Sequence, residues 1–457
     1  LKDVNSQDLY PTSEMTLNSP GVWAEVRQAL PSKLNAVKDL NIVVVSSSEA
    51  SEVELDDINI EVQVPALPPL RLAFLLSYAQ LMRSWDPTTG FADDHVNAPR
   101  GSQQSVPATG FVALATAMAV DLGYVDRATG VAVAQKCIAA LLGAPQQTSV
   151  QLQTHLWAHF LNQGVASSEW STADTALAWH SAYLAAHYFD LAGEVSHLGD
   201  YANSIQFSQL TDAGGNLHWG VDQAGMPLLG IMADFGAEWS LPRLMELFQN
   251  TNMTDPLATH SPPVFCDRDF IDHMGHLWYA EFGAPGSSRP DRYGLDWAQE
   301  RRDHLSRSVA YLGNAFVGGL SSVEIRNIDG NTTYANLQLG TSTCALSESM
   351  TGFDGPWRSM HSVALTSDLD IPSAKLRVGA MVQNGLLLPL SGPVESAIVD
   401  SGSTISRVHT AQVSLNSWFN AGGYYNAVVA DEGLVNNVYV AHQSDTRLTS
   451  ALRTLFP

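Results

Sequence analysis

Residues 177–186 have the sequence Leu-Ala-Trp-His-Ser-Ala-Tyr-Leu-Ala-Ala, which is apolar on more than one face of a helix. A helix at a protein surface has a single apolar stripe, so a helix that is apolar on several sides must pack against neighbours on two faces. Two concentric layers of helices provide such an environment. The stretch therefore predicts an α/α toroid, in which an inner ring of helices surrounds a cavity that opens onto long loops.

Helical spacing of apolar residues continues on both sides of this stretch. No strand–helix–strand alternation accompanies it, which disfavours a parallel sheet or an eight-stranded barrel. After residue 65, weak strand signals occur only at Ser322–Ile328 and Tyr334–Leu339. The predicted helices are Leu70–Trp85, Ala108–Leu122, Arg127–Leu142, Val150–Leu161, Thr172–Leu191, His197–Gln206, Trp239–Gln249, Phe270–Phe282 and Leu295–Phe316.

The first 65 residues differ from the rest of the chain. Their β-branched content and alternation, as in Ile58–Val64, are typical of strands. Pro65, Pro68 and Pro69 then separate this segment from the helical region. We expect a small N-terminal extension with short strands over residues 1–65 and a mainly α toroid over residues 66–457.

Composition limits the partners of the chain. Among 457 residues, 46 are acidic and 23 are Lys or Arg, giving a formal charge of −23 without any basic block. This excludes nucleic acid and anionic membranes and favours a neutral polymer. No apolar run approaches the roughly 18 residues of a membrane span. The chain begins at Leu1, as expected of a secreted protein that has lost a signal peptide, and we expect it to act as a monomer.

Cysteines and glycosylation sequons add weaker expectations about the cellular setting. Cys137 lies in an apolar helical run and is predicted to be buried, which leaves Cys266 and Cys344 as the only plausible disulfide. Asn252 and Asn331 begin N-glycosylation sequons in polar segments. Both features fit a secreted glycoprotein.

Several loops are unusually long and rich in aromatic residues. They are Trp85–Gly110, Thr211–Gly236, Asn250–Asp269 and Gly283–Gly294. Long loops in a compact domain are usually functional, so we expect the site where these loops meet. Asp94, in the first of them, is a candidate substrate-binding residue.

Glu238 is the strongest candidate for catalysis. It lies at the predicted start of a helix, with Trp219 and Trp239 nearby in the sequence as flat surfaces on which sugar rings stack. A carboxyl beside such surfaces loses solvent, and its pKa should rise towards that of a general acid at neutral pH. Alternatively, Glu238 is only a first-turn acid favoured by the helix dipole.

A second cluster surrounds Asp174, at the start of the helix that carries Trp179 and His180. Asp174 is a candidate catalytic carboxylate, and the two aromatic residues are candidates for substrate binding. Ser171 and Asp174 also have the spacing of a capping box, so a structural role remains open.

A third cluster contains His273, His276 and Trp278. The two histidines are three positions apart, but HExxH is absent and no acid has metal-motif spacing, so we expect no metal there. We predict instead that His276 and Trp278 line a polar cavity. Motifs for serine hydrolases, dinucleotides and phosphate loops are also absent, so no cofactor is expected.

The last candidate acids follow an aromatic, Gly-rich stretch near the C-terminus. Asp431 precedes Glu432 and Gly433, and Asp445 lies two residues before Arg447. Asp445 and Arg447 alternatively form a surface ion pair. Cleavage of a glycosidic bond needs only two positioned carboxyl groups and a sugar-binding trough, which is the chemistry that the remaining clusters offer.

These clusters resemble, in type and order, the glycoamylase-like α/α-toroid glycoside hydrolases. That group includes endo-β-1,2-glucanases and the cyclisation domain of cyclic β-1,2-glucan synthases, and the resemblance covers roughly residues 70–450. The matching motifs are Trp85-Asp86-Pro87-Thr88-Thr89-Gly90-Phe91, Ser105-Val106-Pro107-Ala108-Thr109-Gly110-Phe111, Ser171-Thr172-Ala173-Asp174-Thr175, Trp219-Gly220, Glu238, His273–Phe282, Tyr293-Gly294-Leu295-Asp296-Trp297 and Asp431-Glu432-Gly433.

The resemblance implies an (α/α)6 toroid and an inverting endo-hydrolase of β-1,2-glucan that releases sophorooligosaccharides. Glu238 matches the family's acid after the Trp-Gly loop and would be the general acid. Asp431 and Asp174 match positions eligible for the general base. Where the family tends to have Asn-Tyr-Arg, this chain has Ser444-Asp445-Thr446-Arg447, which adds Asp445 as a third candidate base. A different linkage, a transglycosylase, a lyase or a non-catalytic glycan-binding protein remain as alternatives.

Overall fold

The computed structural model describes the chain from residue 67 onward, with gaps. The described residues are 67–96, 101, 103–148, 153–230, 236–249, 265, 269–287, 289–312, 318–326, 332–337, 357–388, 392–399, 405–410 and 413–457. The strands expected over residues 1–65, the sequon asparagines Asn252 and Asn331, and Cys266 and Cys344 all lie outside them. Cys137 is a buried free thiol, as predicted.

Six helices of the described residues form a closed inner ring. Each contacts the next in the order given, and the last returns to the first. They are α2 (Val106–Asp121), α4 (Thr172–Tyr188), α6 (Gly236–Gln249), α7 (Asp269–His273), α10 (His361–Thr366) and α12 (Ser414–Glu432).

Small residues let these helices approach one another closely. A Cβ at Gly110 of α2 would lie 2.6 Å from the carbonyl oxygen of Ala178 in α4, and a Cβ at Gly423 of α12 would overlap the backbone of Ala364 in α10. Almost every residue of α2, α4 and α12 is consequently buried. The prediction that residues 177–186 pack on more than one face is confirmed.

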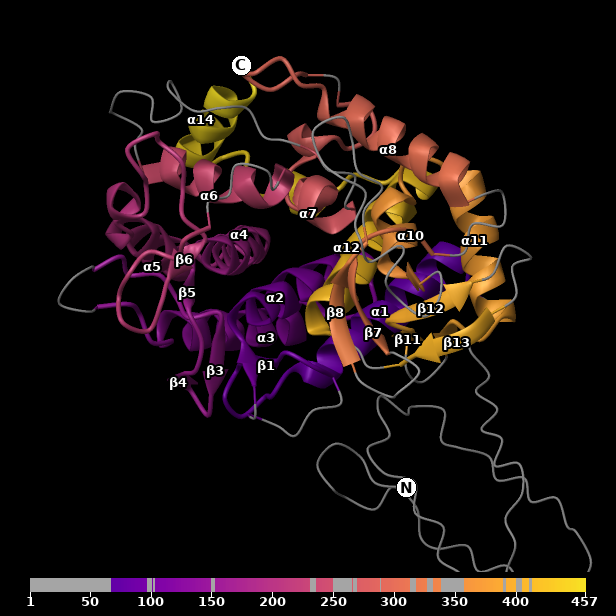
Figure 1. Cartoon of the computed structure of the whole chain (residues 1–457), viewed down its shortest axis with the longest axis horizontal. Helices are drawn as coiled ribbons and strands as arrows, with labels where there is room; N and C mark the ends of the chain where they lie inside the picture. The colour runs from indigo at the N-terminus through magenta and orange to yellow at the C-terminus, as the bar shows by residue number, and fades with distance from the viewer. Residues whose placement is uncertain are drawn as a thin grey trace, which may run out of the picture. The chain divides into compact units, whose positions relative to one another are not determined.

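A second layer of helices surrounds this ring and completes the (α/α)6 toroid, as predicted. Figure 1 shows α5, α14, α8 and α11 around the edge of the molecule. The C-terminal helix α14 packs against α6. The outer helices are α1 (Pro69–Ser84), α3 (Arg127–Leu142), α5 (Ala192–Ser204), α8 (Trp297–Leu312), α11 (Ile371–Gln383) and α14 (Thr446–Leu455). The short helix α13 (Asn437–Val440) and the 3-10 turns η1 (Phe207–Gln209), η2 (Met274–Leu277) and η3 (Ala280–Phe282) connect them.

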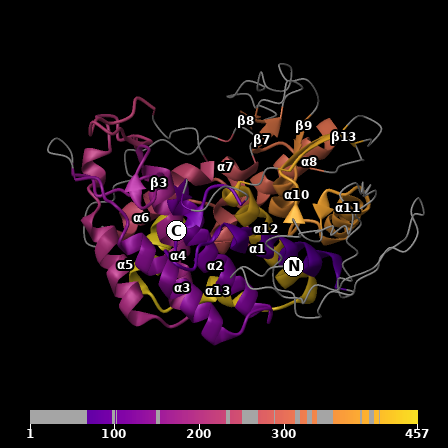
Figure 2. The same ribbon diagram turned by 90° about the horizontal axis from the view of Figure 1, so that it is seen from below.

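Short antiparallel strands lie in the connections between the helices. Figure 2 shows β7, β8, β9 and β13 on one side of the helical layers and α13 on the other. The sheets are β1 (Ala92–Asp93), β2 (Gln104–Ser105), β3 (Phe160–Asn162) and β4 (Val165–Ala166) in that order; β5 (Trp170–Ser171) with β6 (Gly220–Val221); β7 (Ser322–Arg326) with β8 (Thr332–Asn336); β13 (Ile405–His409), β12 (Ser396–Val399) and β9 (Trp357–Ser359) in that order; and β10 (Leu387–Leu388) with β11 (Gly392–Pro393).

Two expectations about elements need correction. The helix predicted over Val150–Leu161 is wrong, because its second half forms bridges with neighbouring segments and ends in β3. The helix predicted over Phe270–Phe282 breaks into α7, η2 and η3. The aromatic, Gly-rich stretch before Asp431 forms helix α12, and its Gly423 allows close contact with α10. No helix in the described residues combines the length and hydropathy that a membrane crossing requires.

Candidate active site

Three inner helices, α2, α4 and α12, begin near one another at one end of the ring. The starts of α2 and α4 share the segment before β3, because the Val106 amide donates to the His159 carbonyl (3.1 Å) and the Ser171 amide to the Trp157 carbonyl (3.2 Å). The start of α12 is joined to β1 by the Ser414 amide, which donates to the Asp94 carbonyl (2.6 Å). Helix N-termini favour negative charge, so carboxylates gathered here are stabilised. We call this end of the ring the rim.

Asp94, His95, Glu324 and His409 form a chain of ionisable groups on the α12 side of the rim. His95 Nδ1 lies 2.9 Å from Asp94 Oδ2, and its Nε2 lies 3.1 Å from Glu324 Oε1. His409 Nε2 lies 3.4 Å from the other oxygen of Glu324. The carboxyls of Asp94 and Glu324 raise the pKa of His95 to about 10, so this ring is charged at neutral pH.

The two histidines keep Glu324 ionised. Burial alone would raise the pKa of this carboxyl, but hydrogen bonds from His409 and His95 outweigh it and lower the pKa to about 2. Glu324 lies between the buried residues Val323 and Ile325 of β7. The alternation of the strand therefore presents Glu324 on the face opposite to that core.

Glu395 contacts the backbone of Glu324, one of these ionisable groups, and is only 4% exposed. It accepts hydrogen bonds from the Glu324 amide (3.2 Å), the Val413 amide (3.3 Å) and the Asn416 side chain. Burial raises its pKa to about 8 despite these bonds. Glu395 thus fixes β7 to the start of α12 from a position with little access to a ligand.

A second chain of ionisable groups lies between the starts of α2 and α4. His159 Nδ1 is 2.9 Å from Glu169 Oε1 and 3.5 Å from Asp174 Oδ2. Burial would lower the pKa of His159, but the charges of Asp174 and Glu169 raise it to about 9, with a further contribution from Asp94. Ligand atoms of His159, Glu169 and Asp174 lie within 4.8 Å of one another, which is a spacing that could hold a metal ion.

Glu238 is half-buried in the first turn of α6, across the ring from α12. The pKa of Tyr334, on β8, is affected by acids from both sides of the ring. Its side chain is 47% exposed, while its hydroxyl is directed to the Ser322 carbonyl (3.4 Å). Loss of solvent around the hydroxyl, followed by the charges of Glu395 and Glu238, raises the pKa of Tyr334.

Trp219 offers a flat surface beside these acids. Its carbonyl accepts from the Thr172 amide at the start of α4 (2.8 Å). One face of its ring covers Gly230, where a Cβ would come within 2.9 Å of the indole, and the side chain is still 43% exposed. Trp239, in contrast, is buried and packs against Tyr293. Trp219 is thus the predicted tryptophan that a sugar can reach.

The structure does not bring the remaining predicted site residues to the rim. Trp179, His180, His276 and Trp278 are all fully buried in the core of the ring. Trp179 and Trp278, for example, donate to the Leu198 carbonyl (2.8 Å) and the Ser181 hydroxyl (2.8 Å).

The two predicted bases near the C-terminus lie at the other end of the inner helices. Asp431 is next to last in α12, roughly 25 Å along that helix from its start, and pairs with Lys375 (2.6 Å). Asp445 caps α14 and accepts from Tyr183 and His187, in the second half of α4. Burial would raise the pKa of Asp445, but these hydrogen bonds lower it. Arg447 donates its backbone amide to Asp445, while its guanidinium bonds to Asn203.

Sequence reasoning did not identify most of the partners at the rim. They are His95, His159, Glu324, Glu395 and His409. Two signals were available: His95 follows Asp94 in a loop predicted to be functional, and Glu324 is a charged residue inside an apolar strand. Ser171 does cap α4, accepting from the Asp174 amide (3.1 Å), while the Asp174 side chain faces His159.

This architecture is the (α/α)6 toroid found in glycoside hydrolases, and solved structures with the same fold include several that act on β-1,2-glucan. An endo-β-1,2-glucanase from Chitinophaga pinensis, solved with sophorotriose and glucose, has a TM-score of 0.64 and 11% identity over 85% of this chain and 97% of its own. A β-1,2-glucanase from Parabacteroides distasonis has a TM-score of 0.66 and 10% identity over 85% of this chain and 60% of its own.

A fungal enzyme has the same fold. The endo-β-1,2-glucanase from Talaromyces funiculosus, solved with sophorose, has a TM-score of 0.55 and 12% identity over 86% of this chain and 91% of its own. No protein-family model matches the chain, and no curated protein matches it in sequence. The resemblance drawn from the sequence motifs is thus confirmed in the fold.

Proposed function

We propose that this chain is a secreted, monomeric glycoside hydrolase that cuts β-1,2-glucan internally, with inversion, and releases sophorooligosaccharides. The observation that carries the proposal is the set of contacts at the rim that joins Asp94 through His95 to Glu324. The exposed Trp219 beside the start of α4 adds a surface for a pyranose ring. The shared fold with enzymes named for β-1,2-glucan supports the choice of substrate.

Glu238 is the proposed general acid. It lies half-buried in the first turn of α6, beside the buried Trp239. In this role it donates a proton to the glycosidic oxygen as the C–O bond breaks.

Asp94 is the proposed general base, on the α12 side of the ring. An inverting enzyme needs a second carboxylate that takes a proton from the attacking water, typically about 6.5–9.5 Å from the acid. The low pKa of the Glu324 carboxyl makes it a weak base. His95, which joins the two acids, then positions Asp94. Asp431 and Asp445, at the far end of the helices, have no role in this proposal.

The acid assignment is tested by Glu238→Gln on linear β-1,2-glucan. We expect the release of reducing ends to fall about a hundredfold or more, with an unchanged circular dichroism spectrum. Glu194→Gln is the matched control, because Glu194 is also the first-turn acid of a helix, α5. If both variants keep near wild-type rates, Glu238 is only a helix-dipole acid and the assignment is wrong.

The reaction class is tested separately on the wild-type protein. Mass spectrometry should show sophorooligosaccharides of intermediate length, and proton NMR should show the α-anomer as the first product. A panel of glucans with other linkages tests the specificity. Unsaturated products would indicate a lyase, and bound sugar without any new reducing ends would indicate a glycan-binding protein; either result contradicts the proposal.

A further inference from the structure

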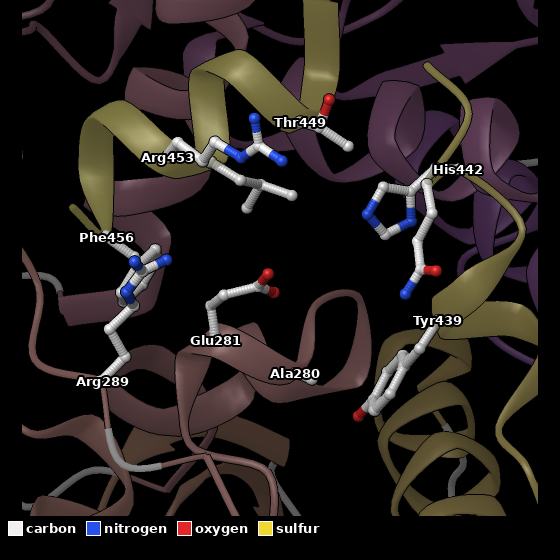
Figure 3. A pocket seen from close by; sticks show the side chains of 10 residues that line it. Ala280, Glu281, Arg289, Tyr439, His442, Thr449, Arg453 and Phe456 are labelled. Atoms are coloured by element: carbon white, nitrogen blue, oxygen red, sulfur yellow. The ribbon is translucent and has the colours of Figure 1, made fainter. Parts of the chain in front are cut away.

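A pocket lies at the end of the ring opposite to the rim. It has a volume of about 370 Å³ and is enclosed by η3, α13, α14 and the segment that contains Arg289 (Figure 3). The α13 side of the molecule is the one that faces away from β7 and β8 (Figure 2). The pocket therefore shares no residue with the acidic rim.

Three charged side chains line this pocket. Glu281, Arg289 and Arg453 make no hydrogen bond or ion pair within the described part of the chain. Figure 3 shows the Glu281 carboxylate and the Arg453 guanidinium pointing into the space. Two guanidiniums and one carboxylate give the pocket a net positive charge, in a chain whose formal charge is −23. Such a local reversal of sign favours a small anion.

His442 adds a neutral polar group to the wall. Its side chain is 4% exposed, and its Nδ1 has no hydrogen-bond partner among the described residues. Burial, and then the nearby His187, lowers the pKa of His442 to about 4. A neutral imidazole both donates and accepts a hydrogen bond, as a hydroxyl partner requires. Leu452 and Phe456, both buried, supply the apolar part of the wall.

We propose that this pocket binds a small hydroxylated carboxylate of the sugar-acid class. The ligand's carboxylate meets the guanidiniums of Arg289 and Arg453, which suit planar anions. Its hydroxyls donate to Glu281 and exchange hydrogen bonds with His442. Its C–H faces pack on Leu452 and Phe456, and the volume admits a molecule the size of a monosaccharide.

Calorimetric titration of the full chain with D-glucuronate tests the site. We expect saturable binding, a weakening of about tenfold or more in Arg453→Gln and in Arg289→Gln, and a further loss of affinity at high salt. Arg302→Gln is the matched control, because Arg302 is an exposed arginine of α8 outside the pocket. Equal affinity in all three variants, or no saturable binding to the wild type, overturns the proposal.

Two further titrations test the class of ligand. Neutral glucose should bind at least about tenfold more weakly than glucuronate, because it lacks the charge that the guanidiniums require. Inorganic phosphate should also bind more weakly, because it has no hydroxylated ring for Glu281 and His442. Equal or tighter binding of either compound contradicts the sugar-acid assignment. Glu238→Gln should leave glucuronate affinity unchanged, so this site and the proposed hydrolysis succeed or fail independently.

Discussion

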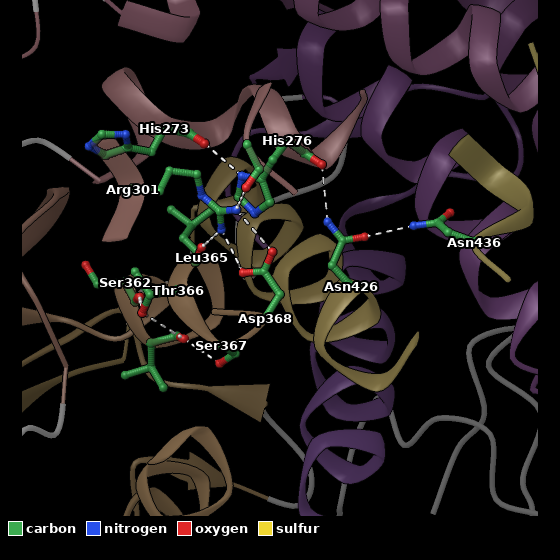
Figure 4. Close-up of polar contacts among 12 residues, drawn as sticks. His273, His276, Arg301, Ser362, Leu365, Thr366, Ser367, Asp368, Asn426 and Asn436 are labelled. Carbon is green, nitrogen blue, oxygen red and sulfur yellow. Dashed lines mark hydrogen bonds and ion pairs between the residues drawn. The ribbon is translucent and has the colours of Figure 1, made fainter. Parts of the chain in front are cut away.

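Two acids of this molecule are held in opposite ways. Asp368 accepts two hydrogen bonds from Arg301, at 2.7 and 3.1 Å, and each side chain is only 1% exposed. Arg301 also donates to the carbonyls of Gly283 and Leu365, so one guanidinium joins three segments of the chain (Figure 4). This pair is closed to solvent and to ligands.

Asp94 is held instead by a histidine at the rim. The Asp94 and His95 side chains are 12% and 31% exposed, and the contact between them continues to Glu324. A histidine can change its charge and leaves the carboxylate reachable, whereas a buried guanidinium does neither. The comparison shows that an aspartate paired with a cation can have two roles. The buried pair with Arg301 stabilises the fold, whereas the pair with His95 leaves Asp94 able to exchange a proton.

The largest effect is expected from breaking the closed pair. Arg301→Met leaves Asp368 buried without a partner, which should lower the free energy of unfolding by about 3–5 kcal/mol. Urea denaturation followed by circular dichroism measures the change. Arg302→Met, on the exposed side of the same helix, is the control and should change stability little.

A double variant sharpens this test. Replacing both partners, as Arg301→Met with Asp368→Leu, removes the unpaired charge and should recover part of the loss. If the double variant is less stable than Arg301→Met alone, Asp368 was not left uncompensated, and the account of a closed pair is wrong.

At the rim, the corresponding change should affect activity and not stability. Asp94→Asn removes the proposed base while keeping the shape of the side chain, so the rate on β-1,2-glucan should fall about a hundredfold, equivalent to about 2.7 kcal/mol. The free energy of unfolding should fall less than in Arg301→Met, since Asn keeps the size of the side chain and leaves no unpaired buried charge. A normal rate with a large loss of stability would show that Asp94 is structural, like Asp368.

The pH dependence of stability separates the two settings further. Glu324 has a lowered pKa, about 2 against an ordinary 4.5, so its contribution is present above pH 4.5 and lost as the pH falls towards 2. His95 has a raised pKa, about 10 against 6.5, so its contribution is present below pH 6.5 and lost as the pH rises towards 10. The rim should therefore contribute most between about pH 4.5 and 6.5.

His95→Gln tests this window. The variant should lose on the order of 1 kcal/mol of stability near pH 5.5 and much less near pH 10, where the wild-type histidine is already neutral in part. Unfolding curves at several pH values measure the difference. A loss that is equal at all pH values would mean that His95 stabilises the rim by packing and not by charge.

The toroid could be predicted from the sequence because the apolar pattern of a single helix indicates which of its faces are buried. Residues 177–186 are apolar on several faces, and that property depends on the helix alone. The breaks between α7, η2 and η3 could not be predicted in the same way, because the apolar pattern of residues 270–282 is continuous. No secondary structure was predicted for the Gly-rich stretch that forms α12, and the close contact of Gly423 with α10 becomes evident only in the structure.

Residues of the candidate site could be predicted only where a neighbouring stretch of sequence indicates a functional loop. Asp94 and Trp219 lie in long loops, and loops of that length indicate function. The contact of His95 with Glu324 joins residues 229 positions apart, and no local pattern encodes it. Motif order likewise could not tell which end of α12 lies at the rim, so the sequence predicted Asp431 as a candidate base and Asp94 only as a substrate-binding residue.

Asp431→Asn should have the smallest effect of these changes. Asp431 pairs with Lys375 at the far end of α12, and a partly exposed ion pair contributes about 0–1 kcal/mol. The rate on β-1,2-glucan should stay within about twofold of wild type, because this carboxylate lies roughly 25 Å along α12 from the rim. A hundredfold loss of rate in a folded Asp431→Asn variant would instead place the general base at the far end of the ring, and the contrast between a reactive rim and a structural interior would no longer hold.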